Sequence, residues 1–304
     1  MFISSKDLGE EIKKLRKQFS LSQKELAEGI CTQAAISSIE LGRTFPSIDI
    51  LYAISVKLHF SIDQLIKELS TTSYLYIQET MNEIDRLVKL NDYKEVFEIT
   101  KLNLKNHTLK TLGNEFNQYI QWHNILSSYY LDQINYQQCI NALEELIDVQ
   151  QDYLLKQSYQ DLKIKNVIGN ILTQNKQYKK ATIYYQDILE KNIKIEGYYR
   201  LKLKVYFNLS KLMFLRSEYQ KSIEIAQEGI LLSIKQEDIS VLPNLFVQFG
   251  QSLSMLPDSD QEQLEQVLEY YMNAINLYKI LQRQWYVDFI NKELIPILPQ
   301  DNNK

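Results

Sequence analysis

The chain has 304 residues, and its 34 lysines and arginines against 38 aspartates and glutamates give a formal net charge of −4. The length allows about two domains or one array of repeats. Only eight glycines and five prolines are present, and because turns between strands rely on these residues, the composition disfavours all-β and α/β folds and favours helices.

The first seventy residues have the apolar spacing of five short helices. In the first of them Leu8, Ile12 and Leu15 recur at helical intervals. A break follows, and Ser22 opens the second helix with Glu25 three residues later. This spacing is typical of a capping box, in which each residue bonds the backbone of the other.

The third to fifth helices have similar start and stop signals. Thr32 precedes a short helix over Gln33–Leu41, and Gly42 is placed to end it in a left-handed conformation. Ser47 precedes the fourth helix. The residues expected to face inward in the last two helices are Ile50, Leu51, Ile54, Leu58, Ile62, Leu65 and Ile66.

The run SQKELAEGICTQAAISSIELGRTFPSIDILYAISVKL resembles the helix-turn-helix domain of the Xre/Cro repressor superfamily. This resemblance implies that the second helix braces across DNA phosphates while the third presents side chains to the major groove. It also implies that Glu40 pairs with Arg16 and fixes the third helix against the first. The alternative is an exposed surface pair of little energy.

Small and polar side chains occupy the expected base-reading positions, which are Gln33, Ala34, Ala35, Ser37 and Ser38. Gln can bond an adenine edge, Ala can touch a thymine methyl, and Ser can bond a base or a phosphate. Candidate phosphate contacts are Gln23, Arg43 and Thr44. Residues 1–70 hold nine basic and nine acidic residues, so the DNA prediction depends on the motif. Simple solvation of these polar residues is the alternative.

Four tyrosines recur at intervals of 41 to 43 residues past position 70. They are Tyr93, Tyr136, Tyr178 and Tyr219, followed three residues later by Val96, Cys139, Ala181 and Ser222. A fifth copy fits with Leu264 and Val267. The pattern predicts that each aromatic opens a second helix and that the smaller residue lets its neighbour approach. It resembles degenerate tetratricopeptide repeats, which implies a right-handed solenoid with a concave face.

Three asparagines share one register in the first helices of these pairs. Asn124, Asn166 and Asn208 lie eleven or twelve residues before the tyrosine that opens the next helix. In a tetratricopeptide array this register faces the groove, where side-chain amides can donate to and accept from an extended peptide backbone. The alternative is that these residues bond helix ends or neighbouring repeats.

The whole chain resembles the PlcR-type branch of Gram-positive quorum-sensing regulators, most closely in LGEEIKKLRKQFSLSQKELAEGIC and FPSIDILYAISVKL, and the resemblance continues through NDYKEV and the last helix near WYVDFINKEL. These proteins join an Xre-like DNA-binding domain to repeats that bind a short imported signalling peptide. The resemblance implies a homodimer in which peptide capture repositions the DNA-reading domains. The positions that match the family's peptide contacts are Lys89, Asn166, Asn208, Asn244 and Tyr286.

Two features of the expected groove stay open. The family's second basic contact falls two residues after Lys89, where this chain has Asn91. Five aromatic residues suit either an apolar pocket or the core between repeats, namely Tyr199, Tyr206, Phe207, Phe246 and Phe249.

The sequence therefore predicts an all-α protein with a helix-turn-helix domain over 1–70, a linker helix and first repeat helix over 71–90, tetratricopeptide-like repeats over 91–280, and a capping helix and tail over 281–304. The predicted function is cytoplasmic, peptide-controlled transcription regulation by a homodimer on a palindromic operator, with neither metal nor cofactor. No HExxH, GxSxG or phosphate-loop motif points to an enzyme, and no apolar run points to a membrane. The alternative is a regulator or adaptor whose repeats bind a partner protein.

Overall fold

The computed structural model describes residues 5–63, 65, 71–105, 112–148, 159–193, 195, 197–257 and 261–298. Every regular element within these ranges is a helix, which confirms the predicted all-α fold. None of the described helices is long and apolar enough to cross a membrane. The chain divides into two compact units, Met1–Gln133 and Ile134–Lys304, which are treated in turn.

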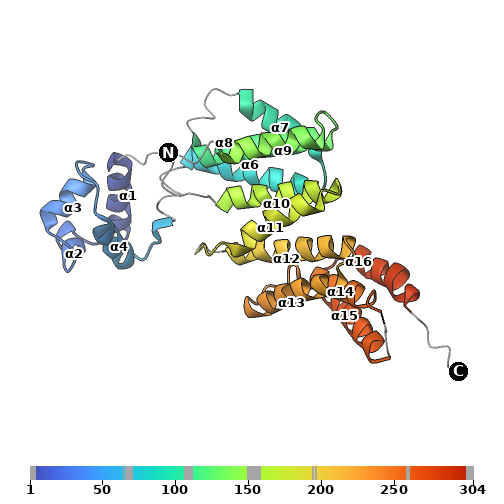
Figure 1. Ribbon diagram of the computed structural model, residues 1–304. Helices are drawn as coiled ribbons and strands as arrows, with labels where there is room; N and C mark the ends of the chain where they lie inside the picture. The colour runs from blue at the N-terminus through green and yellow to red at the C-terminus, as the bar shows by residue number, and fades with distance from the viewer. Residues whose placement is uncertain are drawn as a thin grey trace. The chain divides into compact units, whose positions relative to one another are not determined.

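The N-terminal part of the first unit begins with short helices, of which the second and third carry their predicted side-chain caps, whereas Ser47 makes no such bond to the fourth. Their bounds are α1 Ser5–Gln18, α2 Gln23–Ala27, α3 Gln33–Glu40 and α4 Ile48–Lys57 (Figure 1). Ser22 and Glu25 form the capping box at α2, and the Thr32 hydroxyl accepts from the backbone of α3. Residues 62, 63 and 65 are helical, whereas Ile66 of the predicted fifth helix lies outside the described residues.

Close approach of backbones organises this helix group. Gly42 has φ +67°, as predicted, and a Cβ there would lie 2.5 Å from the Cα of Lys6. A Cβ on Gly9 would lie 2.1 Å from the carbonyl oxygen of Ile39, so α1 and α3 meet where only glycine fits. The core beneath them consists of Leu8, Ile12, Leu26, Ala27, Ile36, Ile39, Ile54, Leu58 and Leu65.

The first unit continues with α6 Thr71–Lys89, α7 Tyr93–Lys105 and α8 Asn114–Tyr130. Helix α7 packs against both α6 and α8. The buried Tyr119 of α8 donates its hydroxyl to the Asp85 carboxylate of α6 at 2.7 Å. The three helices therefore form one packed group.

The second unit is a succession of helices, each packed on the next, from α9 to α16 (Figure 1). Helix α12 also contacts α10 and α14, so alternate helices lie side by side as they do in helical repeats. The helices are α9 Tyr136–Asp148, α10 Tyr159–Gln174, α11 Tyr178–Glu190, α12 Tyr198–Leu215, α13 Tyr219–Lys235, α14 Leu242–Leu253, α15 Gln261–Ile280 and α16 Gln284–Phe289. A π-helical turn, Ile290–Leu294, and a 3-10 turn, Ile295–Ile297, follow α16.

The predicted tyrosine pattern is confirmed at all four regular positions. Helices α7, α9, α11 and α13 begin at the four tyrosines. The residues three positions later are at most 1% exposed, and these are Val96, Cys139, Ala181 and Ser222. Ser222 shows what the small size permits, because its hydroxyl lies 3.0 Å from that of Ser210 and 2.7 Å from that of Ser252, on two other helices.

The turns that precede these tyrosines contain left-handed residues other than glycine. The residues with positive φ are Asn91, Asp132, Lys176 and Ser217, with values between 56° and 61°. Gln282 has φ +54° and lies between α15 and α16, so the C-terminal helical segment begins at Gln284. The turn within each of these helix pairs therefore has its left-handed position occupied by a residue other than glycine.

Glycine is used where a first helix meets a tyrosine ring. A Cβ on Gly169 of α10 would lie 2.5 Å from Cε1 of Tyr185 in α11. A Cβ on Gly250 of α14 would lie 2.7 Å from Cε1 of Tyr271 in α15. Both tyrosines are 1% exposed, so each ring fills the space that the glycine leaves.

Candidate functional site

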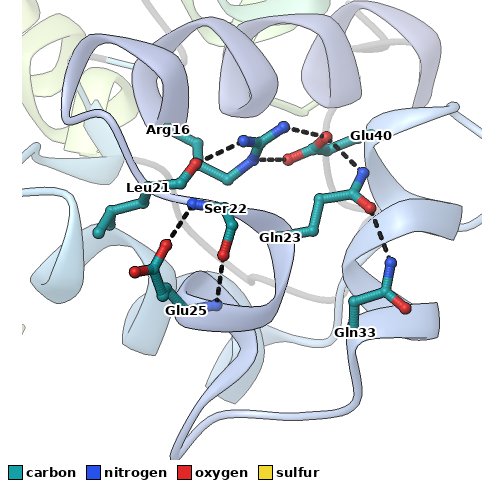
Figure 2. A network of polar contacts seen from close by, with 7 residues as sticks. All are labelled: Arg16, Leu21, Ser22, Gln23, Glu25, Gln33 and Glu40. Carbon is teal, nitrogen blue, oxygen red and sulfur yellow. Dashed lines mark hydrogen bonds and ion pairs between the residues drawn. The ribbon is translucent and has the colours of Figure 1, made fainter.

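A buried ion pair joins α1 to the last residue of α3, as the sequence predicts. Arg16 donates from Nε and Nη2 to the two carboxylate oxygens of Glu40, at 2.5 and 2.9 Å (Figure 2). The two side chains are only 10% and 1% exposed. Arg16 also donates from Nη1 to the carbonyl oxygen of Leu21 at 2.6 Å. The pair is therefore a buried clamp, and the surface-pair alternative is wrong.

Two glutamines extend this clamp to the other end of α3. Gln23 donates from Nε2 to Glu40 at 2.9 Å, and its Oε1 accepts from Nε2 of Gln33 at 2.9 Å. Figure 2 shows Gln23 lying between the other two side chains. The network thus touches both the first and the last residue of α3, and it fixes the helix along its length.

The electrostatics of this network keep Glu40 charged. Burial by itself raises the pKa of the Glu40 carboxyl, but hydrogen bonds from Arg16 and Gln23 outweigh it and hold that pKa below its ordinary value. The hydrogen bond to Glu40 likewise raises the pKa of Arg16. Because both groups are ionised at neutral pH, the bidentate pair is intact under ordinary conditions.

Helix α3 turns its apolar residues inward and its expected base-reading residues outward. Ile36, Ile39 and Glu40 are buried, whereas Gln33 and Ala34 are exposed. The other three candidates, Ala35, Ser37 and Ser38, are partly exposed. The outward surface of the helix is therefore small, polar and uncharged.

The candidate phosphate contacts differ in their surroundings. Arg43 and Thr44 are exposed after α3, and the Thr44 hydroxyl donates to that of Ser38 at 3.1 Å. Gln23, in contrast, uses both ends of its side-chain amide inside the network. The motif predicts only a phosphate contact for Gln23, so its bonds to Gln33 and Glu40 were not predicted from the sequence.

Two of the register asparagines bond each other in the second unit. Asn208 of α12 donates from Nδ2 to Oδ1 of Asn166 of α10 at 3.1 Å, and Asn166 is 8% exposed. In the first unit, Asn124 donates to the hydroxyl of Thr100 at 3.0 Å. Inter-repeat bonding, the alternative to direct peptide capture, therefore occurs at the Asn166–Asn208 pair.

A pocket of about 270 Å³ lies in the second unit and contains two further predicted peptide contacts, together with Phe207, one of the aromatic residues expected either in a pocket or in the core. Helix α12 lines it with Phe207 and Lys211, α14 contributes Asn244, and the C-terminal segment contributes Trp285 and Tyr286. The structure thus brings together Asn244 and Tyr286. We call this cavity the C-terminal pocket.

The C-terminal pocket has a wall of stacked aromatic rings. The rings of Tyr278 and Tyr286 are 4.8 Å apart and inclined by 10°. Those of Trp285 and Phe289 are 5.7 Å apart and inclined by 9°. Such stacking restricts the orientation of each ring, so this wall is preformed.

Two lining residues, Lys211 and Trp285, were not predicted from the sequence. Lys211 lies three residues after Asn208, and that spacing places two residues on one helix face. This spacing from Asn208 is the feature of the sequence from which the position of Lys211 could have been predicted. Lys89, the predicted basic contact, is the exposed last residue of α6 in the first unit.

Comparison with known proteins places the chain in a family. The profile of the RNPP family C-terminal domain matches residues 81–294, and a helix-turn-helix profile matches residues 12–65. A search of curated proteins found no significant match.

The solved structures that resemble the chain extend over nearly all of it. PlcR of Bacillus thuringiensis, in complex with the peptide PapR7 and DNA, is 28% identical with a TM-score of 0.78, covering 95% of this chain and 100% of that one. Apo PlcR is 25% identical with a TM-score of 0.67, covering 95% and 99%. ComR of S. thermophilus, with DNA and its signalling peptide ComS, shares the fold at 16% identity and a TM-score of 0.61, covering 93% and 97%. Since the C-terminal profile spans more than half of the residues, the protein belongs to the RNPP family, as its resemblance to PlcR-type regulators implied.

Proposed function

We propose that this protein is a DNA-binding transcription regulator whose binding is controlled by a short peptide held in its repeats. The observation that carries the proposal is the end-to-end match, at 28% identity, to a protein solved with both a peptide and DNA. On this proposal the protein acts as a regulator and not as a catalyst, in the cytoplasm, where promoter DNA and imported peptide meet.

DNA recognition is assigned to α3 and the residues that flank it. Gln33, Ala34, Ala35, Ser37 and Ser38 would read base edges, and Gln23, Arg43 and Thr44 would contact phosphates. The polar network of Arg16, Glu40 and the two glutamines supports this assignment because it contacts α3 at both ends. With no charged side chain on its outward face, one α3 reads few bases strongly, so a homodimer on a palindromic operator suits the protein.

Peptide recognition is assigned to the repeat helices. The Asn166–Asn208 bond leaves Nδ2 of Asn166 and Oδ1 of Asn208 without another partner in the described part of the chain. One donor and one acceptor side by side match the N–H and C=O of a peptide main chain. The further peptide contacts proposed are Lys89, Asn124, Asn244 and Tyr286.

These assignments give each segment of the chain a proposed role. Residues 1–70 would read DNA, 71–90 would connect, 91–280 would hold the peptide, and 281–304 would cap the array. A peptide alters DNA binding only if it binds one arrangement of the dimer more tightly than another. Helix α6, Thr71–Lys89, is the proposed connection because it follows the helix-turn-helix group directly in the chain.

The test uses purified full-length protein and fragments of the genome that encodes it. Fragments retained by the protein are sequenced, and their binding is measured by gel shift with and without the low-mass peptide fraction of the culture fluid. The proposal expects an inverted repeat and a change in affinity of at least about fivefold on adding that fraction. Failure to enrich any fragment, or an effect that survives digestion of the fraction with protease, would contradict it.

A further inference from the structure

The C-terminal pocket has a single charge on its walls. Among the described residues that line it, Lys211 is the only charged one. Helix α12 contains no Asp or Glu, and helix α14 contains no charged residue at all. Asp288, on the adjoining α16, is outside the lining and accepts a hydrogen bond from Gln284. No described carboxylate forms an ion pair with Lys211, so its charge is available to a ligand.

The rest of the pocket is uncharged and small, and aromatic and aliphatic side chains line it together with the amides of Asn244, Gln248 and Gln251. Phe207 faces it from α12, and Trp285 and Tyr286 face it from the C-terminal segment. Trp285 is 68% exposed, which is unusual for so large an apolar side chain. The volume of about 270 Å³ is slightly below the roughly 300–1,000 Å³ of pockets that enclose a drug-sized ligand. It therefore suits the end of a peptide and not its whole length.

Lys211 also lies on the path expected for a peptide main chain. It follows Asn208 by three residues on α12, so the two side chains share a helix face. Asn208 bonds Asn166 on α10, and Lys211 lines the pocket together with Asn244 on α14. A peptide held at the asparagine pair is therefore directed towards the pocket by one turn of α12.

We propose that the C-terminal pocket binds a carboxylate that adjoins an apolar side chain, with Lys211 as the anchor of the carboxylate. The inference rests on the proposed function and adds the chemical class of the peptide's anchoring end. The apolar side chain lies against Trp285 and Tyr286. The carboxylate belongs either to the C-terminus of the peptide or to an acidic residue beside an apolar one.

Three synthetic probes separate these sources. They are acetyl-trialanyl-phenylalanine with a free C-terminal carboxylate, the same peptide as its amide, and an amidated analogue with glutamate as the penultimate residue. The chain has only two tryptophans, so full-length protein labelled with 5-fluorotryptophan has one fluorine signal from Trp285 and one from the buried Trp122. Loss of one signal in Trp285→Phe assigns them, and titration of each probe yields its affinity.

The proposal expects the Trp285 signal to shift with a carboxylate-bearing probe and the affinity to fall about fivefold or more in Lys211→Met, which keeps the apolar stem. Lys235→Met, an equivalent change on α13 away from the pocket, should leave the affinity within about twofold of the original. Binding of the free acid assigns the peptide terminus, and binding of the glutamyl amide assigns a side chain; either result supports the proposal.

Equal binding of the free acid and both amides, equal losses in the two lysine variants, or no shift of the Trp285 signal with any probe would overturn the anchor. These outcomes are separable from those of the genomic test. A peptide-dependent change in DNA binding that Lys211→Met leaves intact removes the anchor and keeps the regulator. Binding of a carboxylate probe by a protein that selects no DNA fragment would keep the anchor and remove the regulator.

Discussion

Gln33, the first residue of α3, donates its side-chain amide to Gln23 of α2 at 2.9 Å. Since Nε2 points towards Gln23, its second hydrogen and the Oε1 atom remain for another partner. This is the donor and acceptor pair that fits the N7 and N6 positions of adenine. The bond therefore orients the Gln33 amide before any DNA is present.

Replacing Gln33 with Glu should eliminate operator binding, because a carboxylate cannot donate to adenine N7 and repels the phosphates nearby. Footprinting on the selected operator measures the effect, and the melting temperature should fall only slightly, because the variant loses one exposed hydrogen bond to Gln23. Gln18→Glu, the same change at an exposed position of α1, is the control. Full protection by Gln33→Glu would refute this placement of the recognition helix.

Glu40→Ala should destabilise the helix-turn-helix group by about 3–5 kcal/mol, since it leaves the guanidinium of Arg16 buried without its counter-ion. The double variant Arg16→Met, Glu40→Leu should lose less, because it removes both buried charges. Urea unfolding followed by circular dichroism provides the comparison. A double variant less stable than Glu40→Ala would show that the charge left unpaired is not the main cost.

The same pair should make stability depend on acidity. Hydrogen bonds from Arg16 and Gln23 hold the folded-state pKa of Glu40 below its ordinary value despite burial, so its contribution is present above the unfolded pKa of about 4.3. That contribution is lost as the pH falls through the lowered pKa. The urea midpoints of the original protein and of Glu40→Gln should therefore differ above the unfolded pKa of Glu40. They should converge as the pH falls below it. A constant gap at all pH values would contradict the role of this carboxylate.

Asn166→Ala and Asn208→Ala should each abolish the peptide response while the protein stays folded. Each variant removes a proposed main-chain contact and leaves the partner amide unpaired, at a cost of about 1–3 kcal/mol. Calorimetry with the peptide recovered from the active fraction measures binding. Asn141→Ala, on the exposed surface of α9, is the matched control. Unchanged peptide affinity in both groove variants would rule out the asparagine assignment.

Gly169→Ala should destabilise the second unit by about 1–3 kcal/mol, although alanine is the better helix former by about 1 kcal/mol. The added methyl group would lie 2.5 Å from the ring of Tyr185, which is buried and cannot withdraw freely. Thermal unfolding of Gly169→Ala and of the analogous Gly250→Ala tests this. A gain in melting temperature in either variant would mean that the rings yield easily.

The elements that the sequence predicts well are those encoded locally. Ser22 with Glu25 marks a helix start through bonds made within one turn. The repeat tyrosines open their helices, and the smaller residues one turn later are buried, so a pattern read within a single turn predicts both features. The Arg16–Glu40 pair is more distant, and it was predicted through resemblance to a superfamily and not through spacing.

The contacts that the sequence did not predict depend on distances between helices. Asn166 and Asn208 share a register, but register alone does not say whether their amides are near enough to bond each other. Lys211 and Trp285 are 74 residues apart in the chain and meet only because the C-terminal segment packs beside α12 and α14. Such a meeting is a property of tertiary packing, which periodicity in one sequence does not encode.

Lys176 and Ser217 have left-handed backbone conformations, and these conformations lower the stability of the repeats. A side chain in this conformation costs about 1 kcal/mol or more that glycine would not incur. Neither residue lines the C-terminal pocket. The stability of the second unit can therefore be adjusted at these two turns without any change in the residues that line the C-terminal pocket.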